Sequence, residues 1–129
     1  MAITPLVREF ADQVEQLLDA RPHIDRSKMT LTTADAKALI RLPPVEIDVS
    51  DREAILRYGG EPLPIRDHKF VLRVVEAILD GKIEIEISHG LLWRTTRSYM
   101  DGSPRPFLTT RMPVPSLRPR TERRTVTVG

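Results

Sequence analysis

The chain has 129 residues, of which 40% are apolar, a length that fits one domain or one domain with an extension. It contains no cysteine, which excludes disulfide bonds and thiolate metal sites, and its apolar runs are far too short to cross a membrane. The N-terminus lacks the basic region and apolar run of a secretory signal. We therefore expect a soluble protein of the cytoplasm, or of an assembly such as a virion that forms there.

The net charge of +2 hides an asymmetry along the chain. Residues 1–93 carry 12 Lys and Arg against 16 Asp and Glu, which leaves this part at −4. Residues 94–129 carry 8 Arg, no Lys and 2 acidic residues, which leaves this part at +6. A charge split of this kind is typical of a chain with an interaction tail.

The first predicted element is a helix that begins after Thr4. A hydroxyl at the N-cap followed by Pro5 at the first helical position is a favourable helix start, and Pro22 marks its end. Apolar residues recur at helical spacing between these points. The outer face is acidic, so it is either a solvated surface or a docking surface for a basic partner. Its charged residues are Arg8, Glu9, Asp12, Glu15 and Asp19.

Two further helices and a strand are predicted in the middle of the chain. Residues 34–42 favour a short helix that Pro43 stops, and the alternation of apolar and acidic residues over 45–49 predicts a half-buried strand. Ser50 and Glu53 have the spacing of a capping box, which predicts a helix over residues 51–58.

Residues 67–80 predict the central helix, with Asp67 as its cap and Gly81 as its stop. Apolar side chains sweep more than half of its circumference, so we expect it to be buried on more than one side, with the other elements packed around it. The polar strip that remains is formed by Lys69, Arg73, Glu76 and Asp80.

A strand pair follows, over residues 82–87 and 92–99. A two-residue turn would place Arg94 opposite Ile85. A three-residue turn would place Trp93 opposite Ile87, so that apolar residues face each other, and this is the register we predict.

Residues 101–129 change character, with five prolines and six arginines in 29 residues. Proline at this density disfavours helix and central strand, so we predict an extended arm that ends in a short strand over 125–128. The predicted fold class is therefore α+β: a compact head of residues 1–100, small, helical and hairpin-containing around the central helix, and an extended Pro/Arg-rich C-terminal arm of residues 101–129.

No stretch carries a catalytic, metal-binding or cofactor-binding motif. His23, His68 and His89 have no ligand spacing, and Glu84 with Glu86 reads as a cross-strand charge ladder. We predict that the protein is not an enzyme, that it needs no metal or cofactor, and that it binds neither a small-molecule substrate nor a membrane.

The arm is the best candidate for function. The guanidinium group binds carboxylate or phosphate in two-point fashion, and it tolerates partial burial better than an ammonium group. We predict a small structural subunit that docks on protein subunits of the same or a larger assembly. The predicted partner-binding residues are Arg94, Arg97, Arg105, Phe107, Arg111, Arg118, Arg120, Arg123 and Arg124.

Two alternatives involve nucleic acid. The predicted order helix, strand, helix, helix, strand, strand over residues 34–99 is that of a winged-helix DNA-binding protein, although its groove-facing surface would be neutral to acidic. The basic arm itself is a second candidate for binding nucleic acid, but Phe107 is its one aromatic residue for base stacking.

Overall fold

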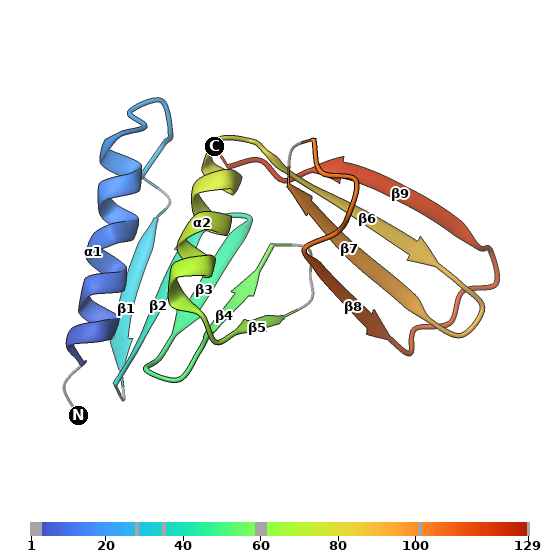
Figure 1. Ribbon diagram of the computed structural model, residues 1–129, viewed down its shortest axis with the longest axis horizontal. Helices are drawn as coiled ribbons and strands as arrows, with labels where there is room; N and C mark the ends of the chain where they lie inside the picture. The colour runs from blue at the N-terminus through green and yellow to red at the C-terminus, as the bar shows by residue number, and fades with distance from the viewer. Residues whose placement is uncertain (1–3, 28, 35, 59–61, 101, 129) are drawn as a thin grey trace.

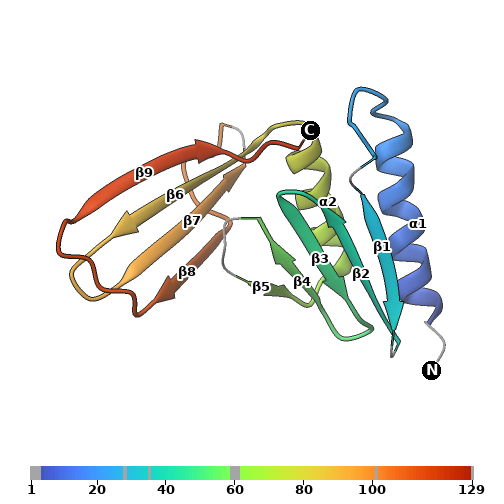
Figure 2. The same cartoon turned by 180° about the vertical axis from the view of Figure 1, so that it is seen from behind.

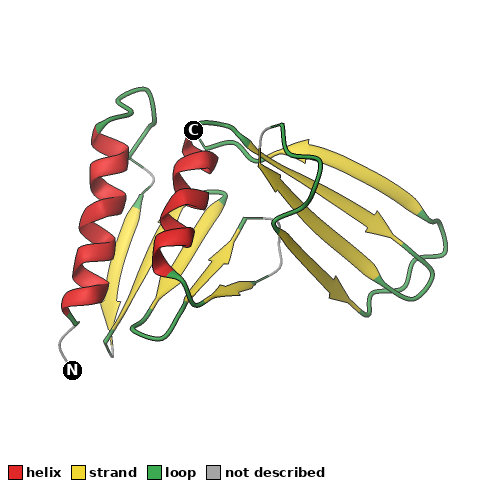
Figure 3. Cartoon of the chain, in the orientation of Figure 1, coloured by secondary structure: helices red, strands yellow, loops and turns green. Residues whose placement is uncertain are grey.

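The computed structural model describes residues 4–27, 29–34, 36–58, 62–100 and 102–128. In this part of the chain, two helices and nine strands form two antiparallel sheets with a pair of helices against one of them (Figures 1 and 3). In chain order the elements are α1 (Pro5–Asp19), β1 (Thr30–Ala34), β2 (Lys37–Leu42), β3 (Val45–Val49), β4 (Ala54–Arg57), β5 (Leu63–Ile65), α2 (His68–Leu79), β6 (Ile83–His89), β7 (Arg94–Met100), β8 (Leu108–Met112) and β9 (Arg120–Thr125).

The first sheet, sheet A, is a meander in which β1 to β5 pair in sequence order. Helices α1 and α2 lie side by side over one of its faces, as the two opposite views show (Figures 1 and 2). Strict alternation sends Ile40 and Ile47 into the core between sheet and helices, while Arg41 and Glu46 face outward with their charged atoms 3.6 Å apart. Alternation of this kind is what one covered and one solvated face require.

Helix α2 begins where the sequence predicts. The Asp67 side chain accepts hydrogen bonds from the backbone N–H groups of Lys69 (3.1 Å) and Phe70 (3.4 Å). The helix ends before Gly81, whose φ of +69° is a conformation that glycine adopts without steric cost. Its wide apolar arc is buried because α1, sheet A and β6 all pack against it.

The second sheet, sheet B, has the strand order β8-β7-β6-β9 and extends away from the helices (Figure 1). Strand β9 returns beside β6 after the β6–β7–β8 meander, which is the connection of a Greek key. At the base of the sheet, Ile83 and Ile85 are completely buried. The Tyr58 hydroxyl, which comes from the end of sheet A, lies 2.6 Å from the Ser98 hydroxyl on β7.

The predicted fold class is wrong, because the chain is mostly β and is not a helical head around a central helix. The predicted helices over 34–42 and 51–58 are replaced by β2 and β4 together with their turns. In β4 the buried Ala54 and Leu56 alternate with partly exposed neighbours, which is a strand pattern. The helix predicted over 67–80 exists as α2, but it covers one face of a sheet beside α1.

The predicted arm contributes two strands to sheet B. Strand β8 pairs with β7, and β9 pairs with β6. The expected strand over 125–128 is displaced, since β9 ends at Thr125 and the chain then continues toward α2 (Figure 1). The predicted boundary between residues 100 and 101 follows the last residue of β7, and residue 101 itself lies outside the described residues.

The hairpin β6–β7 forms, but in another register than predicted. Ile87 faces Thr96 and His89 faces Arg94, so four residues, 90–93, make the connection. Trp93 therefore lies in the turn and has no partner position across the strand. The three-residue turn was predicted because it would pair apolar residues of the two strands. In the structure, Ile87 and Ile85 of β6 instead face the buried hydroxyl residues Thr96 and Ser98 of β7.

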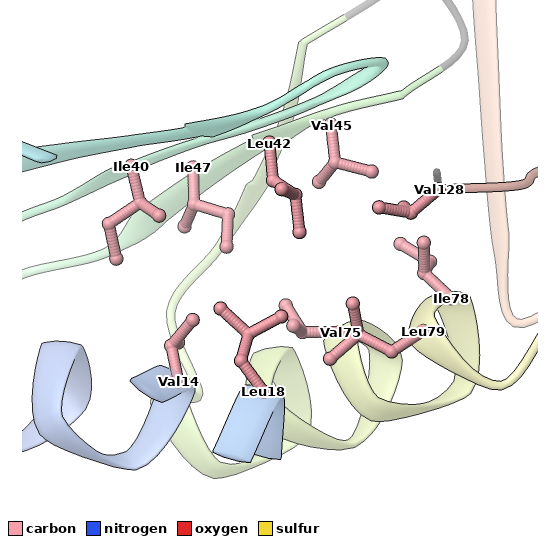
Figure 4. A pocket seen from close by; sticks show the side chains of 10 residues that line it. All are labelled: Val14, Leu18, Ile40, Leu42, Val45, Ile47, Val75, Ile78, Leu79 and Val128. Carbon is pink, nitrogen blue, oxygen red and sulfur yellow. The ribbon is translucent and has the colours of Figure 1, made fainter. Parts of the chain in front are cut away.

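The described chain ends against the core that lies between sheet A and the two helices. The Val126 N–H donates to the Ile83 carbonyl oxygen at 2.9 Å, and the Val126 side chain is buried. Val128 then closes one side of a small apolar cavity of about 20 Å³ between sheet A and the two helices (Figure 4). The cavity is lined by Val14, Leu18, Ile40, Leu42, Val45, Ile47, Val75, Ile78, Leu79 and Val128. None of these side chains offers a water molecule a hydrogen bond, so we expect the cavity to be dry.

Candidate functional site: the tip of sheet B

Large apolar side chains are exposed together at the end of sheet B that lies farthest from the helices. We call this set the tip. In the turn between β6 and β7, Leu92 is 71% exposed and Trp93 is 45% exposed. In the connection between β8 and β9, Leu117 is 96% exposed. The tip consists of Leu91, Leu92, Trp93, Met112, Val114 and Leu117. Monomeric proteins rarely expose apolar side chains of this size together unless they bind something.

Two loops build the tip, and the backbone holds them together. In the β6–β7 turn, the Gly90 N–H donates to the Trp93 carbonyl oxygen at 2.8 Å. In the long connection from β8 to β9, the Ser116 N–H donates to the Gly90 carbonyl oxygen at 3.1 Å. A side chain at position 90 would meet the Trp93 carbonyl oxygen at 3.1 Å, so glycine suits this close approach.

Arginines surround the tip. Arg94 on β7 and Arg120 on β9 both stand in register with His89, on one face of the sheet. On the other face, the Arg111 guanidinium lies 5.9 Å from the centre of the Trp93 ring, which is a cation–π contact. Arg118 lies in the β8–β9 connection. Among the residues that the structure describes, neither Arg111 nor Arg118 has an ion-pair partner.

An open hollow of about 620 Å³ adjoins the tip. Its floor carries the hydroxyl groups of Ser88, Thr95 and Thr121, which stand in one register row across β7, β6 and β9. Trp93, Arg111 and Arg120 form part of its rim. Hydroxyl donors next to guanidinium groups are the chemistry that receives a carboxylate.

A carboxylate of the chain itself lies beside the hollow. Glu122 contacts Arg120 at 3.4 Å and the His89 Nε2 atom at 3.5 Å. The hydrogen bond from Arg120, followed by the nearby His89 imidazole, holds the pKa of Glu122 below its ordinary value. Glu122 therefore stays ionised and offsets part of the charge of Arg120, whereas Arg111 keeps its full charge.

Closer to the base of sheet B, arginines are paired within the sheet. Arg97 lies 3.4 Å from Glu86, and Arg123 lies 3.5 Å from Glu84. Arg123 also lies over the ring of Tyr99, at 5.1 Å from its centre. These pairs reduce the charge that Arg97 and Arg123 offer to a partner, in comparison with Arg111 beside the tip.

The predicted partner-binding residues divide into three groups. Four of them lie around the tip: Arg94, Arg111, Arg118 and Arg120. Three lie lower on the sheet or on β9: Arg97, Arg123 and Arg124. The remaining two, Arg105 and Phe107, precede β8. Phe107 is half-buried, and its ring meets the Phe70 ring edge to face at 5.9 Å, so it helps to pack sheet B against α2.

The apolar part of the tip was missed from the sequence. Leu92 and Trp93 read as the beginning of a half-buried strand, and Leu91 read as part of the three-residue turn before it. The signal that could have found them is three large apolar residues in succession directly after Gly90, which is too many for a strand with one solvated face.

No helix in the described part of the chain is long and apolar enough to traverse a bilayer. Within the same residues, no group of three or more His, Cys, Asp or Glu side chains is placed to hold a metal ion. Comparison of the chain with protein-family models, with curated proteins and with solved structures gave no match.

Proposed function

We propose that the protein is a non-enzymatic assembly protein that binds another protein through the tip of sheet B. The observation that carries this proposal is the joint exposure of Leu91, Leu92, Trp93 and Leu117 next to Arg111 and Arg118, which form no ion pair with the residues that the structure describes. Removing one such side chain from water stabilises a complex by about 1.5–3 kcal/mol before the costs of association are counted. Four of them together supply a gain of the same order as the cost of association.

The composition of the tip favours a protein as the partner. Trp and Arg are enriched in protein interfaces, whereas Lys is depleted, and the chain has no Lys after Lys82. Leucines that protrude from two adjacent loops need a complementary apolar recess on the other surface. A protein offers such a recess, while the backbone of a nucleic acid does not.

The partner should be acidic around this recess. Residues 82–129 carry nine Lys and Arg against four Asp and Glu, a net charge of +5. Arg111 and Arg118 are placed to form charge-assisted hydrogen bonds with carboxylates at the rim of an interface. The opposite charges would also accelerate association at low salt.

Nucleic acid is a second candidate, which one observation favours. Trp93 with Arg111 and Tyr99 with Arg123 place two aromatic rings, each against a guanidinium, on the same sheet. Single-stranded nucleic acid binds to such pairs by stacking. Glu84 and Glu86, however, stand in the middle of this face and would repel phosphates, so we favour the protein partner. Binding to single strands that weakens steeply with salt would support the second candidate.

The experiment places a photo-activatable cross-linking residue at Leu92 in the cells that produce the protein. A matched control carries the same residue at Arg52, an exposed position in the β3–β4 turn. We expect a protein adduct from position 92 that position 52 does not give, and we expect the tip substitution L117S to reduce it. Equal adducts from both positions, or none from position 92, would contradict the proposed function.

A further inference from the structure

A guanidinium group and a hydroxyl group stand next to each other in the hollow that adjoins the tip. Arg111 on β8 and Thr95 on β7 are directly opposite in the register, and both line the hollow. Thr95 is 8% exposed, and its hydroxyl has no hydrogen-bond partner within the described part of the chain. Its O–H group is therefore left to donate to whatever enters the hollow, at the place where Arg111 offers its N–H groups.

Arg111 also carries most of the positive charge that the hollow offers to a ligand. No acidic residue is among the described residues that line the hollow. Arg120 on β9 is offset by Glu122 at 3.4 Å, and Arg97, one register row nearer the base, is offset by Glu86 at 3.4 Å. Arg111 forms no ion pair with the residues that the structure describes. An anion therefore gains most at Arg111.

These donors suit a carboxylate better than a phosphate. The guanidinium fork of Arg111 receives the two oxygens of a carboxylate in two-point fashion, and its single charge balances a single negative charge. A phosphorylated side chain brings nearly twice this charge, and a nucleic acid strand brings one with every nucleotide. Such a ligand would extend over Glu86, which lies on the same face of the sheet.

The apolar wall of the hollow stands at a defined distance from Arg111. Leu92 and Trp93 belong to the turn that joins β6 and β7, which are the two middle strands of sheet B (Figure 1). Arg111 on β8 lies one and a half strand spacings from the middle of this turn, or roughly 7 Å at about 4.8 Å for each spacing.

This distance sets a spacing along a bound segment. An extended segment rises about 3.3 Å per residue, so about two residues span the distance between Arg111 and the turn. Side chains two positions apart in such a segment point to the same face. A carboxylate at one position and a large apolar side chain two positions away can therefore reach Arg111 and Trp93 at the same time.

We propose that the hollow binds an extended segment of the partner protein in which Asp or Glu stands two positions from a large apolar residue. The carboxylate accepts hydrogen bonds from Arg111 and Thr95. The apolar side chain packs against Leu92 and Trp93 and removes them from water. This inference rests on the proposed function, and it adds the chemistry that the partner presents to the tip.

The test titrates the full isotope-labelled chain with a synthetic peptide and follows the backbone amide signals by NMR. The peptide, acetylated and amidated, reads glycine, serine, glutamate, serine, leucine, serine, glycine. One control peptide has glutamine in place of glutamate, and another has glutamate directly beside leucine. We expect saturable shifts at residues 88, 95 and 111, and at least about fivefold weaker binding of each control peptide. Trp93 is the single tryptophan of the chain, so its emission should shift to the blue when the leucine covers it.

Two variants test the two donors, each with a matched control. R111Q removes the guanidinium and should weaken binding of the glutamate peptide at least about tenfold. T95V removes the hydroxyl from a strand position that valine suits, and it should weaken binding at least about threefold. The control R52Q removes an exposed arginine far from sheet B, and T109V removes an exposed hydroxyl on the same face as Arg111, one register row nearer the base. Both controls should bind as the wild type does.

Equal binding of the glutamate and glutamine peptides, or no saturable shift at millimolar concentration, would overturn this inference. So would binding that both R111Q and T95V leave unchanged, or tighter binding of a single-stranded oligothymidylate, which would favour nucleic acid. The cross-linking experiment separates the two proposals. A position-specific adduct in cells without peptide binding overturns this inference alone, whereas the absence of such an adduct overturns the proposed function, even where the peptide binds.

Discussion

The Tyr58 hydroxyl and the Ser98 hydroxyl form a hydrogen bond of 2.6 Å between the two sheets, in a place where both side chains are buried. Tyr58 follows β4 of sheet A, and Ser98 lies in the middle of β7 of sheet B. Apolar side chains of sheet B, among them Ile83 and Ile85, are also buried in the common core. The bond therefore fixes how the two sheets meet, because apolar contacts alone have little directional preference.

Removal of one hydroxyl should destabilise the protein. The substitution Y58F leaves the buried Ser98 hydroxyl without its partner, and we expect the free energy of unfolding to fall by about 1–3 kcal/mol, measured by urea denaturation. The double variant Y58F with S98A leaves no orphaned group, so it should lose less than the sum of the single variants. The control Y99F removes a partly exposed hydroxyl and should cost less than about 0.5 kcal/mol. Additive losses would show that the two hydroxyls act independently.

The same tyrosine predicts a loss of stability at high pH. Burial raises the pKa of Tyr58 from 10.0 to about 12, although the hydrogen bond with Ser98 opposes this. A pKa that is higher in the folded state stabilises the fold fully below pH 10 and loses its effect as the pH rises toward about 12. The loss should reach roughly 3 kcal/mol. Urea denaturation of wild type and Y58F should therefore converge and then cross as the pH rises, whereas parallel curves would contradict this account.

The pair Arg21–Asp80 predicts a sensitivity to acid. Two bonds of 2.7 and 3.0 Å join these side chains and thereby the C-terminal ends of α1 and α2. The bond from Arg21 lowers the pKa of Asp80, so its contribution is present above the ordinary value of 3.8 and is lost as the pH falls through the lower value. Because the pair is partly exposed, we expect D80N to cost about 1 kcal/mol at neutral pH.

The difference between wild type and D80N should shrink in acid, as measured by thermal unfolding from pH 7 to about pH 2. The matched control is E76Q. Glu76 contacts Arg21 at 3.7 Å and is more exposed than Asp80, so this substitution should have less than half the effect of D80N. A D80N curve that stays parallel to the wild type down to the lowest pH would refute the role of the pair.

Val128 should influence stability by the size of its side chain. It closes the small dry cavity, so V128A should enlarge the empty space and cost about 1–2 kcal/mol in the free energy of unfolding. The larger side chain of V128I should fill part of the cavity and raise stability by up to about 1 kcal/mol. The control V114A lies in the exposed tip and should be close to neutral. Chemical denaturation of the three variants tests this, and identical stabilities would show that Val128 does not reach the core.

The elements with strong local signals could be predicted from the sequence. Helix α1 begins after Thr4, at Pro5, as predicted. Helix α2 begins after Asp67 and ends before Gly81, as predicted. The strand predicted over 45–49 is confirmed as β3, whose apolar positions alternate without exception. At each of these places a helix-capping residue, a helix-ending glycine or a strict alternation of apolar and polar residues favours one conformation.

The predictions failed where helical propensity and a strand pattern coincide. In 34–42 the helix formers Ala, Lys and Leu are abundant, yet Ala38, Ile40 and Leu42 alternate and become the core side of β2. At Ser50 and Glu53, the capping-box residues instead close a turn, in which the Ser50 N–H donates to the Glu53 carbonyl oxygen at 2.9 Å. The secondary structure of these two segments is determined by pairing with neighbouring strands, which residues within the segments themselves do not indicate.

The winged-helix alternative depended on these helices and loses its support with them. The predicted arm failed for a different reason. Its prolines, though dense, all lie outside the segments 108–112 and 120–125, which are free of proline and therefore able to pair. The positions of the prolines indicate the secondary structure better than their density does, because a strand needs only five or six residues without proline.

The direction of the strands in sheet B has a mechanical consequence. Their axes lie along the line between the base, where β6 follows α2, and the tip: β6 and β8 run toward the tip, and β7 and β9 run back (Figure 1). A pull on the tip would load β6 lengthwise against β7 and β9, so neighbouring strands would have to slide and break many bonds at once. Peeling, in which bonds break singly, would require a sideways force. Sheet B is thus shaped as a stiff stalk, suited to a linkage that bears tension along its length.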